Sequence, residues 1–181
     1  MDNVLHYFIL LPLLGLLLSN LPDKKQESLI FWNAFSVLVL QWAGLILFSI
    51  YWLANGAEPV FEKFVTYYKH GNAEFSFDLY FDKLTLVYGF MAGLIATLVA
   101  LFSRYYMHRD PGYRRFFSNM LFFFTGINLI VFSGNFETLF LGWEVLGISS
   151  FLLIGFYRER YLPVKNSMKV MSLFRLSDVM L

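Results

Sequence analysis

The sequence contains no cysteine, and this absence removes several kinds of chemistry at once. Disulfide bonds, thiolate catalysis and sulfur-ligated metals are all excluded. Histidine is also scarce, because the chain has only His6, His70 and His108, which lack the spacing of a metal cluster. We therefore expect no metal site in this chain.

Charged residues are few as well, and their signs are balanced. They make up 15% of the chain, against about 25% in soluble domains. The formal net charge is +1, and no basic stripe is present to hold a phosphate backbone, which argues against a nucleic-acid partner. No glycine-rich phosphate loop, Ser/His/Asp set or haem-type histidine pair occurs either. We expect neither a catalytic site nor a bound cofactor in this chain.

Apolar side chains, in contrast, are abundant and make up 58% of the sequence. Several runs reach the ~20 residues that a helix needs to cross about 30 Å of hydrocarbon. The N-terminus has neither a basic segment nor a small-residue cleavage site, so we expect its first run to be a retained helix rather than a signal peptide. The pattern predicts an all-α integral membrane protein with five complete spans and the start of a sixth, over residues 4–20, 29–54, 84–102, 116–132, 137–156 and from 164 onward.

The long connection between the second and third runs has a different pattern. From Glu74 to Asp82, apolar and polar residues alternate, which is typical of a half-buried strand. A turn signal at His70, Gly71 and Asn72 precedes it, so we predict a small β-hairpin outside the lipid, against the helix ends. The expected organisation is two transmembrane helices in 1–54, an extracytoplasmic loop with the hairpin in 55–83, and helices three to five with the start of helix six in 84–181.

Basic residues predict the orientation of these helices. They gather in the loops after the first, third and fifth runs, as Lys24, Lys25, Arg104, Arg109, Arg114, Arg115, Arg158, Arg160 and Lys165. An even number of spans separates these loops, so they share one side of the membrane, which the positive-inside rule makes the cytoplasm. The N-terminus and the acidic hairpin loop then lie outside. We expect a multi-pass protein of a bacterial inner membrane.

Glu144 is the most unusual residue, because it lies within the fifth apolar run. It is only ~4–5 Å from the expected bilayer centre, where a charged side chain costs at least ~2.5–3.5 kcal/mol. Such a buried carboxyl is either protonated or close to a cation, and both conditions suit a proton relay. The alternative is a neutral, hydrogen-bonded glutamic acid that only fixes helix packing. Glu137 falls on the same helix face, but at the membrane edge, where a solvated acid near a helix N-terminus is the better interpretation.

The sixth run carries a second group of charges. Arg175 and Asp178 lie roughly 15–20 Å into this helix, and their i,i+3 spacing lets their side chains meet. They form either a structural ion pair or part of a transport path. Lys165 is expected to be a snorkelling anchor at the helix end, whereas Lys169 is deeper and could couple to Glu144.

Several segments resemble one known family. They are residues 77–84, 103–107, 142–144 (Gly-Trp-Glu), 150–156 and 175–178. Together they resemble the start of the antiporter-like L subunit (chain 5) of proton-pumping NADH:quinone oxidoreductase. The same superfamily includes the multisubunit Na+/H+ antiporters and the membrane subunit of bacterial inorganic-carbon uptake systems.

The resemblance implies a proton-translocating subunit in which Glu144 is the carboxyl of an antiporter-like half-channel, with Arg175 and Asp178 as the family's pair in helix six. Two departures are visible: Ser177 replaces the glycine usual in respiratory members, and segment 163–166 resembles the carbon-uptake branch. The alternatives are therefore a proton-coupled subunit of an inorganic-carbon uptake system or of a multisubunit Na+/H+ antiporter.

A non-transporting membrane scaffold is the alternative from another class. The family's partner lysines and broken helices lie beyond the sixth helix. We therefore expect another segment or chain to supply the remaining helices, and we expect the lipid bilayer and other membrane subunits of a multisubunit complex as partners.

Overall fold

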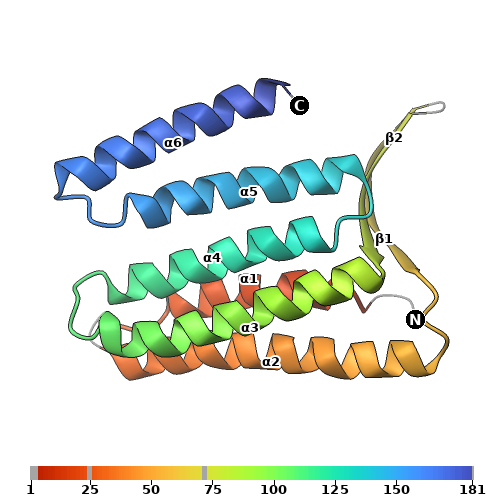
Figure 1. The fold of residues 1–181 in the computed structure, drawn as a ribbon, viewed down its shortest axis with the longest axis horizontal. Coiled ribbons are helices and arrows are strands. Elements are labelled where there is room, and N and C mark those ends of the chain that lie inside the picture. The colour runs from red at the N-terminus through yellow and green to blue at the C-terminus, as the bar shows by residue number, and fades with distance from the viewer. Residues whose placement is uncertain (1–3, 24–25, 71–72, 181) are drawn as a thin grey trace.

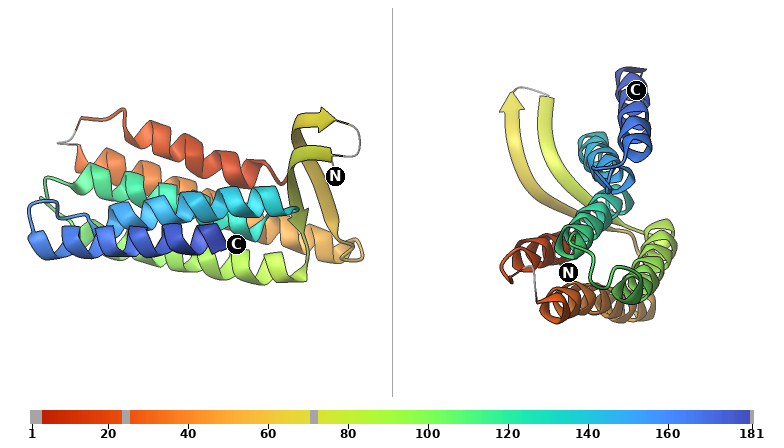
Figure 2. Two further views of the ribbon diagram at one scale, coloured as in Figure 1. Left: turned by 90° about the horizontal axis from the view of Figure 1, so that it is seen from above. Right: turned by 90° about the vertical axis from the view of Figure 1, so that its left-hand side faces the viewer.

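The computed structural model describes residues 4–23, 26–70 and 73–180, which fold into a helical bundle with a β-hairpin at one end (Figure 1). Seen from the end of the bundle, α4 lies in the centre, and it packs against α1, α2, α3 and α5 (Figure 2). In chain order the elements are α1 (Tyr7–Ser19), α2 (Glu27–Ala54), β1 (Val60–His70), β2 (Ala73–Phe81), α3 (Lys83–Tyr106), α4 (Tyr113–Val131), α5 (Phe136–Ile154) and α6 (Tyr161–Met180).

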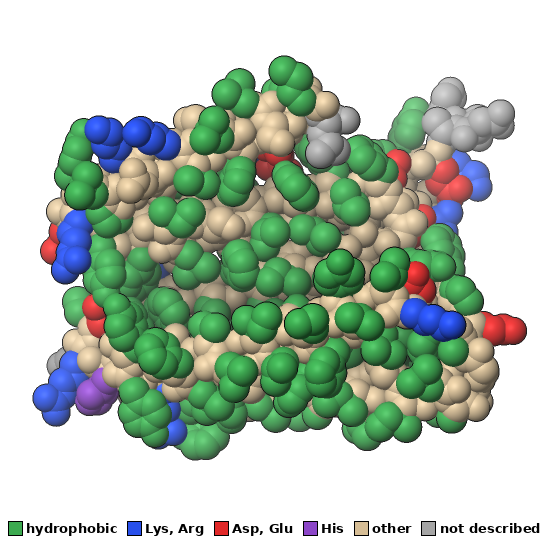
Figure 3. Space-filling view, in the orientation of Figure 1, with side chains coloured by type: hydrophobic (Ala, Val, Ile, Leu, Met, Phe, Trp, Pro, Cys, Tyr) green, Lys and Arg blue, Asp and Glu red, His purple; other side chains and the backbone are tan. Residues whose placement is uncertain are grey.

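The outside of the bundle is apolar. Figure 3 shows hydrophobic side chains across the middle of one face, while most charged side chains gather at its two ends. Leu17, Leu47 and Phe102 are each more than 60% exposed. Soluble monomers rarely expose continuous apolar surface of this extent, whereas a lipid environment favours it. The predicted integral membrane protein with an added hairpin is confirmed.

Length and composition identify some of the membrane spans directly. Within the described residues, α2, α3 and α5 are the helices long and apolar enough to cross a bilayer. The α1 helix is apolar but has only 13 residues, and α4 begins with Tyr-Arg-Arg. The predicted spans at α1 and α4 therefore stay predictions.

Several helices extend beyond their apolar runs. The α3 helix continues to Tyr106 and α4 begins at Tyr113, so Arg104 and Arg114 lie in helices rather than in the predicted loop. The predicted start of the sixth helix near Val164 is wrong, because α6 begins at Tyr161. Pro163 lies in its first turn, where the missing N–H would have had no helical acceptor. An apolar run marks the lipid-embedded part of a helix and not its ends.

The predicted hairpin is present, but its burial differs from the alternating pattern. β1 and β2 pair antiparallel with two irregularities in register. The polar positions Ser76 and Asp78 are only 6% and 8% exposed, whereas the apolar Phe75 is 53% exposed. Asp82 lies outside the strand and caps α3, because its carboxylate accepts the Thr85 N–H at 2.9 Å.

The burial of the polar positions follows from where β2 docks. Its other edge meets the connection between α4 and α5: the Tyr80 N–H donates to the Phe132 carbonyl at 2.9 Å, and the Gly134 N–H donates to the Asp78 carbonyl at 2.8 Å. An added Cβ at Gly134 would lie 3.0 Å from the Asp78 carbonyl carbon, so a larger residue would push the β2 backbone away by a few tenths of an ångström.

The same connection supplies partners for the Asp78 side chain. Its Oδ2 accepts from Ser76 Oγ at 2.9 Å and from Asn135 Nδ2 at 3.1 Å. The Asp78 N–H donates to Thr138 Oγ1 at 3.0 Å. Asn135 also caps α5, since its Oδ1 accepts the Thr138 N–H. The hairpin is therefore joined to the start of the helix that carries Glu144.

Two glycines bring α4 and α5 into backbone contact. A Cβ on Gly126 would lie 2.9 Å from the Leu146 nitrogen, and a Cβ on Gly142 would lie 2.8 Å from the Ile130 nitrogen. Small residues allow this close approach in membrane helices, where packing replaces the hydrophobic effect as the driving force. The α4 and α5 helices are therefore in close backbone contact at Gly142 and Leu146, two residues on either side of Glu144.

Gly142→Ala is expected to lower the free energy of unfolding by about 1–3 kcal/mol, the usual cost of overpacking, because the backbone of α4 cannot move away locally. Gly147→Ala is the matched control on the same helix, where the new Cβ would lie 3.6 Å from Phe174 Cδ2, an ordinary contact. The control should be neutral or slightly stabilising, since alanine favours helix. Thermal unfolding in detergent measures both, and equal melting temperatures for the two variants would contradict the proposed backbone contact.

Candidate functional site between the fifth and sixth helices

The α5 and α6 helices lie side by side and run in opposite directions (Figure 1). Near the turn that joins them, a Cβ on Gly155 would lie 2.8 Å from Ser167 Oγ, so the helices touch closely there. Further along, the contact between Gly147 and Phe174 is looser. This antiparallel packing places the middle of α5 opposite the last turns of α6.

An ion pair between the two helices lies in this region. Nη1 of Arg175 is 2.7 Å from Oε1 of Glu144 and 2.6 Å from Oε2, so one nitrogen contacts both carboxylate oxygens. Charge-assisted hydrogen bonds of this length are strong where water is excluded. The sequence allows two arrangements for Glu144: a protonated carboxyl, or a carboxylate close to a cation. The structure has a cation, Arg175, in contact with this carboxylate.

A second carboxylate completes the group. Asp178 Oδ2 is 3.7 Å from Arg175 Nη1, one helical turn along α6. Its Oδ1 accepts from the indole Nε1–H of Trp143 at 3.1 Å. The predicted i,i+3 pair of Arg175 and Asp178 is thus in contact, but Arg175 lies closer to Glu144. One permanent positive charge is shared by two carboxylates.

The sequence predicts that Glu144 is buried, but in the structure this group is partly exposed. The Glu144 side chain is 22% exposed and that of Arg175 is 50% exposed, while Asp178 is 12% exposed. The reason is that α6 packs against α5 on one side only, and nearly all of its other residues are exposed. The ion pair therefore lies at an open edge of the described bundle.

Lys169 is not brought into this group. It is exposed, and it makes no hydrogen bond or ion pair with any residue that the structure describes. It precedes Arg175 by six residues, which is about 9 Å along the helix and roughly a third of a turn away in direction. The predicted coupling of Lys169 to Glu144 stays a prediction.

The contribution of Trp143 was not predicted from the sequence. A half-buried indole N–H usually finds an acceptor, and this is the only signal that could have suggested a polar role. Which acceptor it finds depends on the register between α5 and α6, and a single sequence does not contain that register.

The chemistry open to this group is proton transfer. Among the described residues, no three His, Asp or Glu side chains gather closely enough to hold a metal ion. The guanidinium of Arg175 stays charged at all relevant pH values, whereas each carboxylate can bind or release a proton. Moving Arg175 between its two partners would change which carboxylate is left without a cation.

The double variant Glu144→Gln/Arg175→Gln is expected to lose less stability than the sum of the losses of the two single variants. Each single change leaves one charge without its closest partner, so the coupling free energy should be about 1 kcal/mol or more, above the ~0.5 kcal/mol within which independent sites add. Combining Glu144→Gln with Lys169→Gln provides the control and should be additive. Chemical unfolding in detergent measures the cycle, and additivity of the first pair would show that the contact has no energetic weight.

Comparisons with known proteins show which family this chain matches. Residues 67–117 match the family described as NADH-ubiquinone oxidoreductase (complex I), chain 5 N-terminus. Residues 133–181 match the family described as NADH:quinone oxidoreductase/Mrp antiporter, TM. The first match covers the end of β1, β2, α3 and the start of α4, and the second covers α5 and α6 with the ion pair.

Individual relatives agree with these matches. NADH-ubiquinone oxidoreductase chain 5 of Metridium senile is 33% identical over 171 residues, which is 93% of this chain and 28% of the relative. NADH-quinone oxidoreductase subunit L of Neisseria meningitidis is 32% identical over 183 residues, which is 98% of this chain and 27% of the relative. The chain therefore spans less than a third of the length of these curated relatives.

A solved structure has the same fold. It is a chain of the membrane-bound sulfane sulfur reductase, an archaeal respiratory membrane complex, with a TM-score of 0.76 and 17% sequence identity. The similarity covers 97% of this chain and 34% of that chain. On the two family matches and the named relatives, the chain belongs to the superfamily of antiporter-like membrane subunits that includes subunit L (chain 5) of NADH:quinone oxidoreductase.

Proposed function

We propose that this chain is the N-terminal part of a proton-translocating membrane subunit of an NADH:quinone oxidoreductase-type complex, with Glu144 as a proton-relay carboxyl. The matched relatives are named as subunits of such enzymes, which supports the assignment. The observation that carries the proposal is the ion pair between Glu144 and Arg175 on two adjacent membrane helices.

The ion pair suggests how a proton would be held and released. While Arg175 contacts Glu144, the carboxylate is neutralised by the guanidinium and needs no proton. If Arg175 turns to Asp178, Glu144 is left as an isolated charge in a medium of low dielectric constant, which is costly unless it binds a proton. The return of Arg175 would expel that proton. Asp178 is thus the second position of a switch.

The rest of the proton path lies outside these three residues. Lys169, about one and two-thirds turns earlier on α6, is proposed as a further cation of the path on the exposed side of that helix. The open edge beside Arg175 is where the remaining helices of the subunit would complete the path. Other membrane subunits of the complex are the expected partners.

The charge distribution supports one placement in the membrane. The helix ends and turns that carry Arg109, Arg115 and Arg158 lie at one end of the bundle, and the hairpin lies at the other (Figures 1 and 3). The positive-inside rule puts the arginine-rich end in the cytoplasm. We propose a bacterial inner membrane location with the N-terminus and the hairpin outside.

A second candidate within the superfamily is a proton-coupled subunit of an inorganic-carbon uptake system. The observation that favours it is the segment 163–166 in the first turn of α6, which resembles that branch. Affinity purification of the tagged full-length protein separates the two: quinone-reducing subunits as partners favour the respiratory complex, and a large zinc-containing soluble partner favours carbon uptake.

Glu144→Gln in the full-length protein is expected to abolish proton translocation by this subunit, because the amide cannot bind and release a proton. Glu137→Gln is the matched control in the first turn of the same helix and should keep translocation. NADH-driven acidification of inverted membrane vesicles, read with a pH-sensitive dye, measures both after co-purification has shown that the complex assembles. Normal acidification with Glu144→Gln would leave only the scaffold function.

A further inference from the structure

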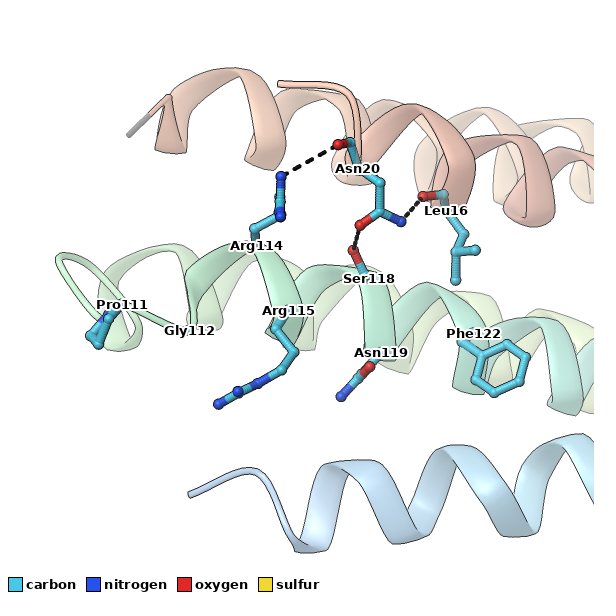
Figure 4. Close-up of a pocket in the computed structure, with 9 residues that line it drawn as sticks. All are labelled: Leu16, Asn20, Pro111, Gly112, Arg114, Arg115, Ser118, Asn119 and Phe122. Carbon is cyan, nitrogen blue, oxygen red and sulfur yellow. Dashed lines mark hydrogen bonds between the residues drawn. The ribbon is translucent and has the colours of Figure 1, made fainter. Parts of the chain in front are cut away.

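Two arginines at the start of α4 line a cavity that the proton path does not use. The cavity has a volume of about 570 Å³ and lies between α1 and α4, at the end of the bundle opposite the hairpin (Figure 4). Its lining includes Arg114, Arg115, Ser118 and Asn119 from α4 and Asn20 from the end of α1. All five can donate hydrogen bonds, so the cavity is rich in donors.

The two guanidinium groups lack a counter-charge. Within the described residues, neither Arg114 nor Arg115 forms an ion pair with a carboxylate. Arg114 Nη1 only reaches the Asn20 and Pro22 carbonyls at 3.4 Å. Arg115 donates one hydrogen bond to the Phe156 carbonyl at 2.9 Å and lies 4.8 Å from the centroid of the Phe156 ring, while its buried Nε has no hydrogen-bond partner among the described residues. Positive charge near a helix N-terminus is unfavourable unless an anion is present.

The nearby carboxylates do not fill this role. Asp110 lines the neighbouring cavity that Arg115 also borders, but its Oδ1 accepts the Gly112 N–H at 2.7 Å. Glu159 borders that neighbouring cavity together with Arg158 and Arg160. The donors of the first cavity therefore match an anion with several oxygen atoms, such as a phosphate group.

A second, apolar cavity adjoins this one on the side towards the hairpin. Phe122 lines both the arginine-rich cavity and a second cavity of about 270 Å³. The second cavity is almost wholly apolar and is bordered by Ile9, Leu10 and Leu13 of α1 and by Leu129 of α4. The two cavities together are lined by α4 from Arg115 to Leu129, about 21 Å along the helix, which exceeds the ~15 Å hydrocarbon thickness of one leaflet; we call them the α1–α4 groove.

A polar, cationic mouth joined to an apolar groove of this length fits one kind of molecule. We propose that the α1–α4 groove binds one anionic phospholipid, with its phosphate on Arg114 and Arg115 and an acyl chain along Leu13 and Phe122. The charge of the two arginines selects an anionic headgroup over a zwitterionic one. The groove selects a lipid over a free phosphate, because the acyl chain adds apolar contact area that a soluble ion lacks.

Native mass spectrometry of the purified full-length protein, stripped of lipid and titrated with phosphatidylglycerol or phosphatidylcholine, tests the assignment. Phosphatidylglycerol is expected to bind at one site at least about tenfold more tightly, and the preference should shrink at high salt. Arg114→Gln/Arg115→Gln should lose this preference. Arg109→Gln/Lys165→Gln removes the same charge at the same end of the bundle outside the groove and should keep it.

Two further variants separate the possible outcomes. Arg114→Gln alone disturbs only the two long contacts of that side chain, so this variant should fold. It should also weaken phosphatidylglycerol binding, which keeps the proposal testable if the double variant does not fold. Leu10→Trp fills the apolar groove at a half-exposed position without changing charge, and it should weaken the long-chain lipid but not glycerophosphoglycerol, the soluble headgroup.

Some results would overturn the proposal. Equal binding of the two lipids by the unmodified protein, or equal loss in the groove variant and its charge control, would show that no headgroup site exists. Glycerophosphoglycerol binding as tightly as the lipid would assign the cavity to a soluble phosphate. Undiminished lipid binding by Leu10→Trp would remove the acyl-chain groove.

Discussion

The absence of water in the hydrocarbon layer is the constraint on which this structure depends. A polar group that finds no partner there costs several kcal/mol, so every backbone group must be satisfied within its own helix and every charge must find an opposite charge or a helix end. Most of the bundle follows this rule: its exterior is apolar, and most charged residues lie at its two ends, although Lys169 lies within α6 without an ion pair among the described residues (Figure 3). Glu144 and Arg175 satisfy it by pairing with each other.

The same constraint explains the role of the hairpin. The chain between α4 and α5 has to turn back with its backbone groups exposed, and β2 accepts and donates the hydrogen bonds that this turn needs. Asn135 links the turn to α5 by capping that helix while it also donates to Asp78. The start of α5 is fixed in this way against the hairpin, and the distance of Glu144 from the hairpin end of the bundle follows from it.

Much of the architecture could be predicted from the sequence, because apolar runs and alternating strands reflect burial directly. The helices and the hairpin lie near the expected places, although the ends of α3, α4 and α6 differ, and Glu144 and Arg175 stand out through the cost of a charge in an apolar run. Two features besides the Trp143 contact could not be predicted. Ser76 and Asp78 look like solvent-facing positions, since the sequence does not reveal that α5 covers them.

The partner of Arg175 is the other feature. Asp178 is its neighbour in sequence, but Glu144 is closer in space, because the packing of Gly155 against Ser167 sets how α5 and α6 align. Pairing within one helix can be predicted from spacing, whereas pairing between helices depends on this alignment. A single sequence contains the first kind of information and not the second.

The tight contact between Gly155 and Ser167 also has a mechanical consequence. The α5 helix packs against α4 through Gly126 and Gly142, whereas α6 contacts only α5 among the described elements, so a change in the α5–α6 angle would be a tilt of α6. Its fulcrum is the tight contact near the turn, and Arg175 lies eight residues, or about 12 Å, along the lever. A tilt of only about 10° therefore moves the base of the arginine by about 2 Å, a displacement on the scale of a hydrogen bond. A small force applied by neighbouring helices to the last turns of α6 would be converted into the making or breaking of one ion pair.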